Sequence, residues 1–289
     1  METKTKKLIS YIILPLLLAL CFVQYLHAQA EPDWLMHVNF FDVGQGDSFL
    51  ITTYEGNQIL VDGGPGKGVL EELGRAVPYY DRVIEMVVLT HPHNDHMEGL
   101  VEVLEKYEVK KILMPNVEYK STVYEEFLRA AKDESAEIVY AAQGQRIYLD
   151  KATVLDIMYP LSKEVAKPKK SDDVNDASIV AKVTFGRTKI LLTGDAGSDI
   201  EKKLLPMFDL DADLLKVGHH GSKHSTSEEL LAEATPEYSV IQVGNNKYGH
   251  PAPEILEKLS KINSKVYRND HQGSIEFVSD GSVFRPVEN

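Results

Sequence analysis

The run of residues 91–96, which reads HPHNDH, constrains the fold of this chain more than any other segment. It places three imidazoles and one carboxylate directly after the apolar residues 85–90. On an extended backbone, residues two apart point to the same side, so His91 and His93 can face one metal ion. Asp95 and His96 follow the end of the strand, where the chain turns, and can face a second ion. This set of side chains suits zinc, and manganese or iron with weaker preference.

Two later segments also end an apolar run with ligand-type side chains. Residues 189–195 (KILLTGD) end in Asp195, and residues 213–220 (DLLKVGHH) end in His219 and His220. Taken alone, the aspartate would be a turn residue and the histidines a surface pair. Open α/β sheets place their sites at the carboxyl ends of strands, so we expect the three strand ends to meet.

With these segments the chain resembles the metallo-β-lactamase superfamily, and within it the hydrolase domains of ComEC-type competence proteins and of phosphorylcholine esterases. The resemblance implies an α/β fold, the αββα four-layer sandwich, over nearly the whole chain after residue 30. It rests on six segments in order, residues 41–47 (FDVGQGD), 59–64 (ILVDGG), 91–96, 191–195 (LLTGD), 216–222 (KVGHHGS) and 248–251 (YGHP).

The resemblance also implies a role for each matching position. His91 and His93 would bind the first ion, Asp95 and His96 the second, and Asp195 would bridge both. One of the two adjacent histidines would complete the second site, and we favour His220, with His219 near the substrate. Asp62 would orient the histidine loop from behind, as metal-bound imidazoles usually need.

One departure from the family concerns the first ion. Many members supply a further histidine to it, but this chain has none between His96 and His219. The matching residues are Asn175 and Asp176, either of which would supply oxygen in place of nitrogen. We therefore expect a weaker first site that tolerates manganese better.

The chemistry expected of such a site is hydrolysis. Two divalent ions can share a water and make it a hydroxide near neutral pH, with Asp95 orienting this nucleophile. His219 and His250 are candidates to protonate the leaving group. Gln45, Asp47 and Tyr248 are candidates to line the cleft, although Asp47 could equally cap its turn and residues 249–251 could form only a turn.

We therefore expect a dinuclear zinc or manganese hydrolase of phosphodiester or phosphate-ester bonds, with an anionic substrate. The ComEC-type segments favour phosphorus, because the resemblance implies nucleic acid or phosphocholine substrates. The alternatives are a carbonyl hydrolase acting on a lactone or β-lactam, and a metal-stabilised binding module without turnover.

Residues 1–30 have the pattern of a secretory signal peptide. Lys4, Lys6 and Lys7 form a basic start, residues 8–26 are apolar, and residues 28–30 (AQA) are a small-x-small cleavage site. We expect one hydrolase domain over residues 31–289, secreted and without a membrane partner after cleavage. The alternative is an uncleaved membrane anchor, since nineteen apolar residues could just span a bilayer.

The charge of the chain limits its partners. The net charge is −13, and removal of residues 1–30, which carry three lysines and Glu2, leaves −15. A surface this acidic repels polyanions at long range, so we expect no tight non-specific binding of nucleic acid. Cys21 is the only cysteine, so the exported domain would fold without disulfides.

The rest of the chain predicts strands interspersed with amphipathic helices. We expect helices at residues 97–107, 121–132, 198–205, 227–234 and 252–261. The clearest strands are expected at residues 36–41, 49–53, 58–61, 112–114, 179–185, 189–192, 239–243, 265–267 and 274–278.

Overall fold

The computed structural model describes residues 11–23, 34–161, 169–170 and 174–288. Contacts divide the chain into two units, Met1–Trp34 and Leu35–Asn289. In the first unit, residues 11–23 form a helix. Among the described residues, no helix combines the length and apolar character that crossing a membrane requires. The expected cleavage site at residues 28–30 lies outside the described residues, so export stays a prediction.

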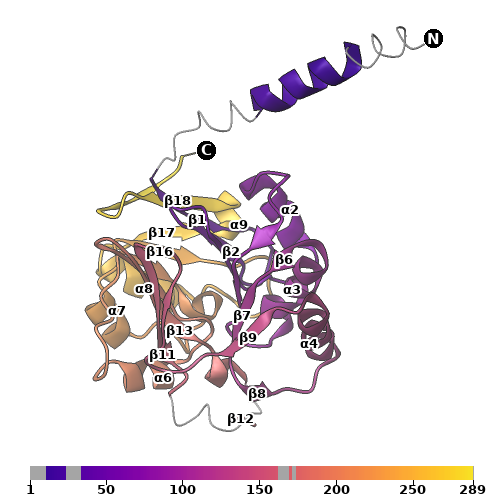
Figure 1. Cartoon of the computed structure of the whole chain (residues 1–289). Coiled ribbons are helices and arrows are strands. Elements are labelled where there is room, and N and C mark those ends of the chain that lie inside the picture. Colours follow the sequence, from indigo (N-terminus) through magenta and orange to yellow (C-terminus); the bar gives the residue numbers. More distant parts are fainter. Residues whose placement is uncertain (1–10, 24–33, 162–168, 171–173, 289) are drawn as a thin grey trace, which may run out of the picture. The chain divides into compact units, whose positions relative to one another are not determined.

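The second unit contains two large β-sheets (Figure 1). The first has the strand order β19-β18-β1-β2-β3-β5-β7-β9, so the beginning and the end of the unit pair within one sheet. Its strands are β1 (Met36–Phe40), β2 (Phe49–Thr52), β3 (Gln58–Val61), β5 (Met86–Val88), β7 (Lys111–Met114), β9 (Glu137–Tyr140), β18 (Ile275–Ser279) and β19 (Phe284–Pro286).

The second sheet has the order β10-β11-β13-β14-β15-β16-β17, and its strands run parallel from β14 onwards. These strands are β10 (Arg146–Tyr148), β11 (Thr153–Tyr159), β13 (Val180–Phe185), β14 (Thr188–Leu192), β15 (Leu214–Lys216), β16 (Tyr238–Ile241) and β17 (Lys265–Arg268). Two small pairs, β4 (Val83–Ile84) with β6 (Glu108–Val109) and β8 (Val117–Glu118) with β12 (Lys169–Lys170), complete the strands.

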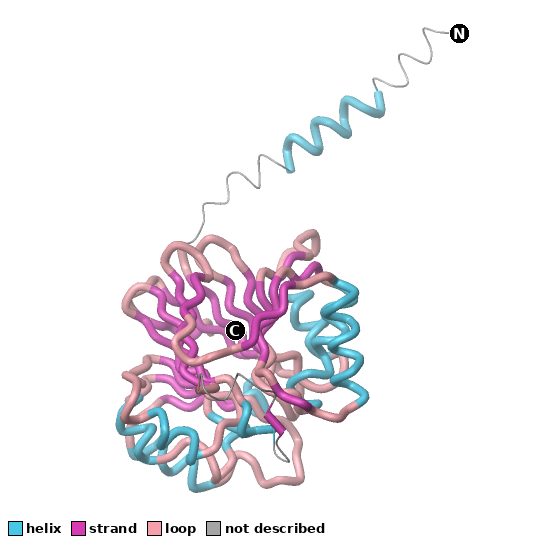
Figure 2. Tube along the Cα trace, turned by 60° about the horizontal axis from the view of Figure 1, so that its bottom comes forward, coloured by secondary structure: helices cyan, strands magenta, loops and turns pink. Residues whose placement is uncertain are grey.

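Helices cover the outer face of each sheet, and Figure 2 shows strands in the middle with helices on two sides. One apolar cluster joins the first sheet to its helices, and another joins the second sheet to its own. The layers are therefore helix, sheet, sheet, helix, which confirms the predicted αββα sandwich. The first set of helices is α2 (Gly68–Ala76), α3 (Asn94–Lys106) and α4 (Thr122–Glu134); the second is α6 (Ser198–Leu204), α7 (Glu228–Ala234) and α8 (Pro253–Lys261); the short α9 (Asn269–Gln272) follows β17.

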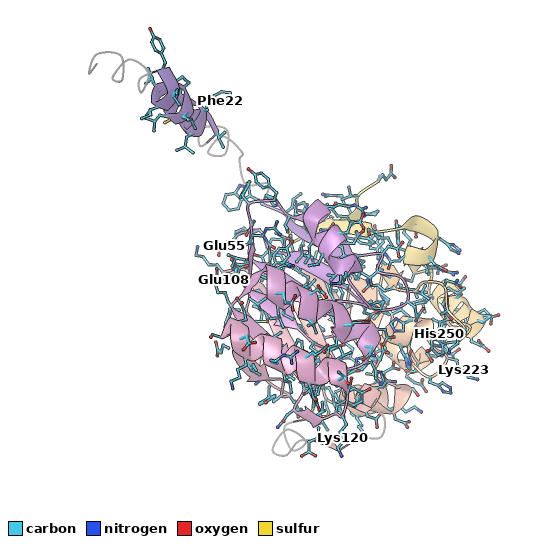
Figure 3. All side chains as sticks on the ribbon, turned by 90° about the vertical axis from the view of Figure 1, so that its right-hand side faces the viewer. Phe22, Glu55, Glu108, Lys120, Lys223 and His250 are labelled. Carbon is cyan, nitrogen blue, oxygen red and sulfur yellow. The ribbon has the colours of Figure 1, made fainter. Side chains whose placement is uncertain are left out.

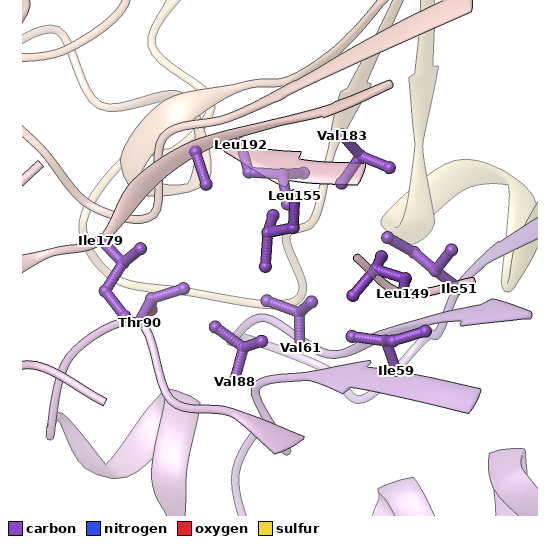
Figure 4. A pocket seen from close by; sticks show the side chains of 11 residues that line it. Ile51, Ile59, Val61, Val88, Thr90, Leu149, Leu155, Ile179, Val183 and Leu192 are labelled. Atoms are coloured by element: carbon purple, nitrogen blue, oxygen red, sulfur yellow. The ribbon is translucent and has the colours of Figure 1, made fainter. Parts of the chain in front are cut away.

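The two sheets pack face to face through a third apolar cluster, which includes Phe40 and Phe277 from the first sheet and Ile157 and Val183 from the second. Side chains from both sheets point toward one another there (Figure 4). The packing leaves a void of about 10 Å³ with an almost wholly apolar lining. A space this small and apolar offers a water too few polar partners, so it is a packing defect and not a ligand site.

Close backbone packing fixes α3 against the first sheet. A Cβ atom on Gly99 would lie 2.1 Å from the carbonyl oxygen of Gly63, so only glycine fits at this crossing. Hydrogen bonds from Gly99 N to the oxygen of Gly64 (3.0 Å) and from Gly63 N to the oxygen of His96 (2.6 Å) join the two segments. The first turn of α3 is thereby held beside the end of β3.

Candidate metal centre

The HPHNDH run begins just beyond the end of β5 and continues into α3. His93 precedes the helix with an extended backbone (φ −75°, ψ 150°), and Asp95 and His96 lie in the first helical turn. The expected turn after the strand is thus the start of a helix. His91 and His96 are fully buried, with ring centroids 4.1 Å apart. His91 Nε2 lies 3.1 Å from His93 Nδ1, so these two imidazoles point to one place.

Asp62 lies directly behind the HPHNDH run. Its carboxylate accepts hydrogen bonds from Thr90 N (2.8 Å), Thr90 Oγ1 (2.6 Å) and His96 Nδ1 (2.8 Å). These bonds fix both the strand end and the tautomer of His96, whose Nε2 consequently turns toward Asp195. This position agrees with the orienting role that the family resemblance implies for Asp62.

Asp195 lies at the centre of the site. It follows β14, and its carboxylate faces imidazoles from both halves of the chain. Its oxygens lie 3.4 Å from His96 Nε2 and 3.8 Å from His91 Nε2 in the N-terminal half. They also lie 3.6 Å from His219 Nε2 and 3.7 Å from His220 Nε2. Such spacing fits atoms that share an ion better than atoms that bond to one another.

His219 and His220 follow β15 in a tight turn, both with left-handed backbone (φ 48° and 53°). His220 is buried and donates from Nδ1 to the carbonyl of Gln242 (3.0 Å). Its Nε2 therefore faces the cluster, 3.4 Å from Asp95 Oδ2. His219 is more exposed, and its Nε2 also points toward Asp195. The structure brings both histidines to the site, His220 from beneath and His219 from the cleft.

Asp47 lies behind His220 as part of a buried ion pair. Its Oδ2 is 2.6 Å from Lys216 Nζ, and its Oδ1 is 3.1 Å from His220 Nδ1. Both partners of the ion pair are 1% exposed. Asp47 therefore holds His220 in place and does not line the cleft. Lys216 was not predicted as a site residue, because a single lysine in a strand usually faces solvent.

These residues have the chemistry of a metal site. Ligand atoms of Asp47, His96, Asp195 and His220 lie within 4.8 Å of one another, and all four side chains are buried. Within the described part of the chain, His96 Nε2, His220 Nε2 and Asp195 Oδ1 are buried without a hydrogen-bonding partner. Burying such atoms unpaired is costly, whereas a divalent cation would satisfy all three. Oδ1 of Asp47 is also buried without a hydrogen-bonding partner among the described residues, but its Oδ2 is paired with Lys216. Asp95 has no described lysine as a partner and lines the cleft, so it is the better ligand.

The electrostatics of the cluster are strongly coupled. Burial favours neutral imidazole, but the carboxylates of Asp195 and Asp47 outweigh it and raise the pKa of His220 to about 10. Asp195 and Asp62 likewise outweigh burial and raise the pKa of His96. Burial and the neighbouring His96 hold the pKa of His91 well below its usual value. His91 is thus ready to bind a metal at neutral pH, whereas His96 and His220 must first lose a proton.

The cluster opens into a cleft of about 370 Å³. Of the two candidates for the missing histidine position, only Asn175 lines it; Asp176 is exposed and lies outside it. Tyr119, which the sequence analysis missed, lines it too. The complete lining is Gln45, His93, Asn94, Asp95, Tyr119, Asn175, Asp195, His219, His220, Tyr248 and His250.

His250 lies at the side of this cleft, its ring 5.7 Å from that of His219. Burial lowers its pKa, with further lowering from His219. The turn that carries it is held by Asn246, which accepts from His250 N (3.1 Å) and donates to its carbonyl (2.8 Å). Residues 249–251 therefore form an ordered turn that also contributes His250 to the cleft.

The family model described as the metallo-beta-lactamase superfamily matches residues 41–244. The chain is 29% identical to ComE operon protein 3 of Bacillus subtilis over 87% of this chain and 34% of that protein. It is 31% identical to Recombination protein 2 of Haemophilus influenzae over 90% of this chain and 31% of that protein. The chain thus spans about a third of the length of these relatives.

Among solved structures, the fold is similar to that of YhfI from Bacillus subtilis, described as a metallo-beta-lactamase fold protein. The TM-score is 0.56 at 15% sequence identity, and the match covers 84% of this chain and 99% of YhfI. At this level of identity the likeness concerns the fold.

Proposed function

Because this chain belongs to the metallo-β-lactamase superfamily, we propose that it is a metal-dependent hydrolase of phosphodiester or phosphate-ester bonds. One observation carries the proposal. His96 Nε2, His220 Nε2 and Asp195 Oδ1 are buried without other partners among the described residues, and Asp195 and His220 line an open cleft. A site that only stabilised the fold would not need to open onto a cleft.

The ligands divide into two sets that share Asp195. His91 and His93, with His219 and Asn175 nearby, would hold the first ion. Asp95, His96 and His220 would hold the second, and zinc and manganese both suit these atoms. When bound, such ions lower the pKa of water and stabilise negative charge that develops on the substrate.

The chain's own residues supply orientation and a proton. Asp62 keeps Nδ1 of His96 protonated, and the carbonyl of Gln242 does the same for His220, so each presents Nε2 to the site. His250 can protonate the leaving group, because it lines the cleft with its ring 5.7 Å from that of His219. Burial lowers the pKa of His250, and an anionic substrate bound beside it would raise that pKa again and favour the protonated form.

The relatives support phosphorus over carbonyl as the centre of attack. The chain is 31% identical to a protein named for recombination, and recombination acts on nucleic acid, whose backbone is a phosphodiester. The match covers only 31% of that protein, so a nucleic acid substrate for this chain is part of the proposal.

The test is turnover by the purified, metal-depleted chain to which zinc or manganese is returned. We expect hydrolysis of bis(4-nitrophenyl) phosphate, and loss of it to background in Asp95→Ala and His96→Ala, both still folded by circular dichroism. His271→Ala is the matched control, because that imidazole is exposed on α9 outside the cleft. Hydrolysis of a lactone alone would replace the proposal with a carbonyl hydrolase. Bound metal with no turnover of either substrate would leave a binding module.

A further inference from the structure

An aromatic side chain lies on each side of the metal cleft, one from each half of the chain. Tyr119 follows β8, and its ring meets that of His93 edge-on at 6.2 Å. Tyr248 lies in the turn before His250, with the two rings 5.8 Å apart and inclined by 31°. Tyr119 therefore lies beside a proposed metal ligand, His93, and Tyr248 lies beside the proposed proton donor, His250.

The two tyrosines differ in how they are held. Tyr119 is partly buried against the apolar cluster under α4 and meets the ring of Tyr124 at 6.1 Å. It is a fixed platform. Tyr248 is 66% exposed, so the protein gains little by burying its ring. An exposed ring at the mouth of a cleft is better explained by a ligand that covers it.

Exposed lysines neighbour the cleft residues along the chain. Lys120 follows Tyr119, Lys247 precedes Tyr248 with Nζ 6.0 Å from its ring, and Lys223 lies three residues after His220. Figure 3 labels Lys120, Lys223 and His250 toward the lower and right-hand margins of the domain. Among the described residues none of these three lysines forms an ion pair, whereas Lys67, Lys189 and Lys261 elsewhere do. On a chain of net charge −13, these three lysines place positive charge close in sequence to residues that line the cleft.

Resting on the proposed function, we propose that Tyr119 and Tyr248 determine specificity by stacking on the bases beside the scissile phosphodiester of an unpaired nucleic acid strand. Planar rings with adjacent cations match the alternation of base and phosphate along such a strand. A glycerol phosphodiester has no planar group for the rings. A choline headgroup would use the rings, but the lysines would repel its cation.

The size of the cleft favours an unpaired strand over a duplex. About 370 Å³ lies in the range of small-ligand sites, so the cleft would hold the scissile phosphate with the bases beside it at its margins. In a duplex the faces of the bases are covered by their neighbours, and exposing them requires unstacking. The acidic surface elsewhere restricts binding to the few nucleotides at the cleft, which is consistent with weak non-specific affinity.

The test compares two oligonucleotides that differ only in their bases. The metal-loaded full chain is titrated with a labelled eight-residue strand and with an abasic strand of equal length, both with phosphorothioate linkages that resist hydrolysis. Fluorescence anisotropy should show tighter binding of the strand with bases. Tyr119→Leu and Tyr248→Leu should each reduce that preference by about five- to tenfold, whereas the phenylalanine variants keep it. Annealing the complement should weaken binding.

Tyr148→Leu is the control, because Tyr148 is 70% exposed on β10 and lies outside the cleft. Equal affinity of the wild type for the two strands, or an unchanged preference in Tyr248→Leu, would overturn the stacking proposal. Since Tyr248 is largely exposed, its variant tests the idea even if Tyr119→Leu fails to fold. Hydrolysis of bis(4-nitrophenyl) phosphate is scored separately. A preference for bases without any turnover would reject the hydrolase and retain the stacking residues.

Discussion

We propose that Asn175 weakens the binding of the first ion. It lines the cleft at the position where many relatives supply a histidine, and its amide oxygen is a harder ligand than imidazole. We predict that Asn175→His raises the zinc retained after dialysis against a mild chelator. The matched control is Asp176→His, whose side chain is exposed outside the cleft. Metal analysis that finds both variants equal to wild type would show that another residue, such as His219, completes the site.

Glu201 on α6 positions the turn that carries His219 and His220. Its buried carboxylate accepts from Thr226 N (2.6 Å) and Ser227 N (2.8 Å), and the Thr226 hydroxyl accepts from Gly218 N (3.2 Å). Glu201→Ala would leave two buried N–H groups unpaired. We predict a loss of about 2–4 kcal/mol in the free energy of unfolding, measured in urea. A loss as small as that of an exposed glutamate, such as Glu229→Ala, would contradict this role.

The same residue gives a pH dependence of stability. Burial outweighs the hydrogen bonds from Ser227 and Thr226 and raises the pKa of Glu201 above its ordinary 4.5. The folded state therefore binds this proton more tightly than the unfolded state. The contribution to stability is full below pH 4.5 and is lost as the pH rises through the folded value. Glu201→Gln should abolish this part of the decline, so its free energy of unfolding relative to wild type should change between pH 4.5 and 7.

Single site residues can be predicted from the sequence where ligands lie close together along the chain. Residues that only folding brings to the site cannot be predicted in this way. The HPHNDH run is visible because its four candidate ligands lie within six residues. Tyr119 stands among ordinary neighbours, and Lys216 opens the KVGHHGS segment without itself being a ligand-type residue. Nothing in the sequence says that β8 carries Tyr119 to His93, or that Lys216 turns inward to Asp47.

Among the elements, α3 shows where apolar periodicity misplaces a boundary. The pattern predicts a helix from Met97, but α3 begins at Asn94. The first turn consists of Asn94, Asp95 and His96, whose polar side chains serve the site and break the pattern. Conversely, α2 went unpredicted, since glycines at 68 and 74 in nine residues lower its helix propensity. The strands β1, β2 and β3 match their predictions to within a residue, because β1 alternates in burial and β2 and β3 are short buried runs.

The contact between α3 and the end of β3 leads to a prediction about both stability and metal content. Gly99→Ala places a methyl group against the carbonyl of Gly63, which must move together with the first turn of α3. We predict a loss of about 1–3 kcal/mol in the free energy of unfolding, together with lower metal content. Gly74→Ala is the matched control: its Cβ meets nothing within 4 Å, so it should gain about 0.5–1 kcal/mol. Full metal content in Gly99→Ala would show that α3 does not set the ligand geometry.

For the whole molecule, the metal site joins the two halves of the sandwich, since Asp195 and His220 come from the second and the HPHNDH run from the first. Nearby carboxylates raise the pKa of His96 and of His220, which favours the imidazolium form of both side chains in the metal-free protein. We predict that metal binding at pH 7 releases about two protons. Calorimetric titrations in two buffers of different ionisation enthalpy measure this number. Identical heats in both buffers would contradict it.

The same shifts predict how the chelated protein responds to base. A histidine whose folded pKa is raised stabilises the fold fully below about pH 6.5, and this contribution is lost as the pH rises through the folded value, about 10 for His220. The melting temperature of the chelated chain should therefore fall between pH 7 and 10 by more than that of the metal-loaded chain.

The antiparallel pairing of β1 with β18 could not be predicted either, because nothing in the sequence of one strand specifies the other as its neighbour. It has a consequence for how the protein is made. The ribosome delivers every proposed metal ligand before it delivers β18, which flanks β1 and completes the first sheet. A nascent chain therefore carries the proposed ligands for some time before the first sheet is complete. A metal ion that binds the unfinished chain would join histidines before the fold has fixed their positions. Metal binding after the first sheet is complete should therefore favour correct assembly.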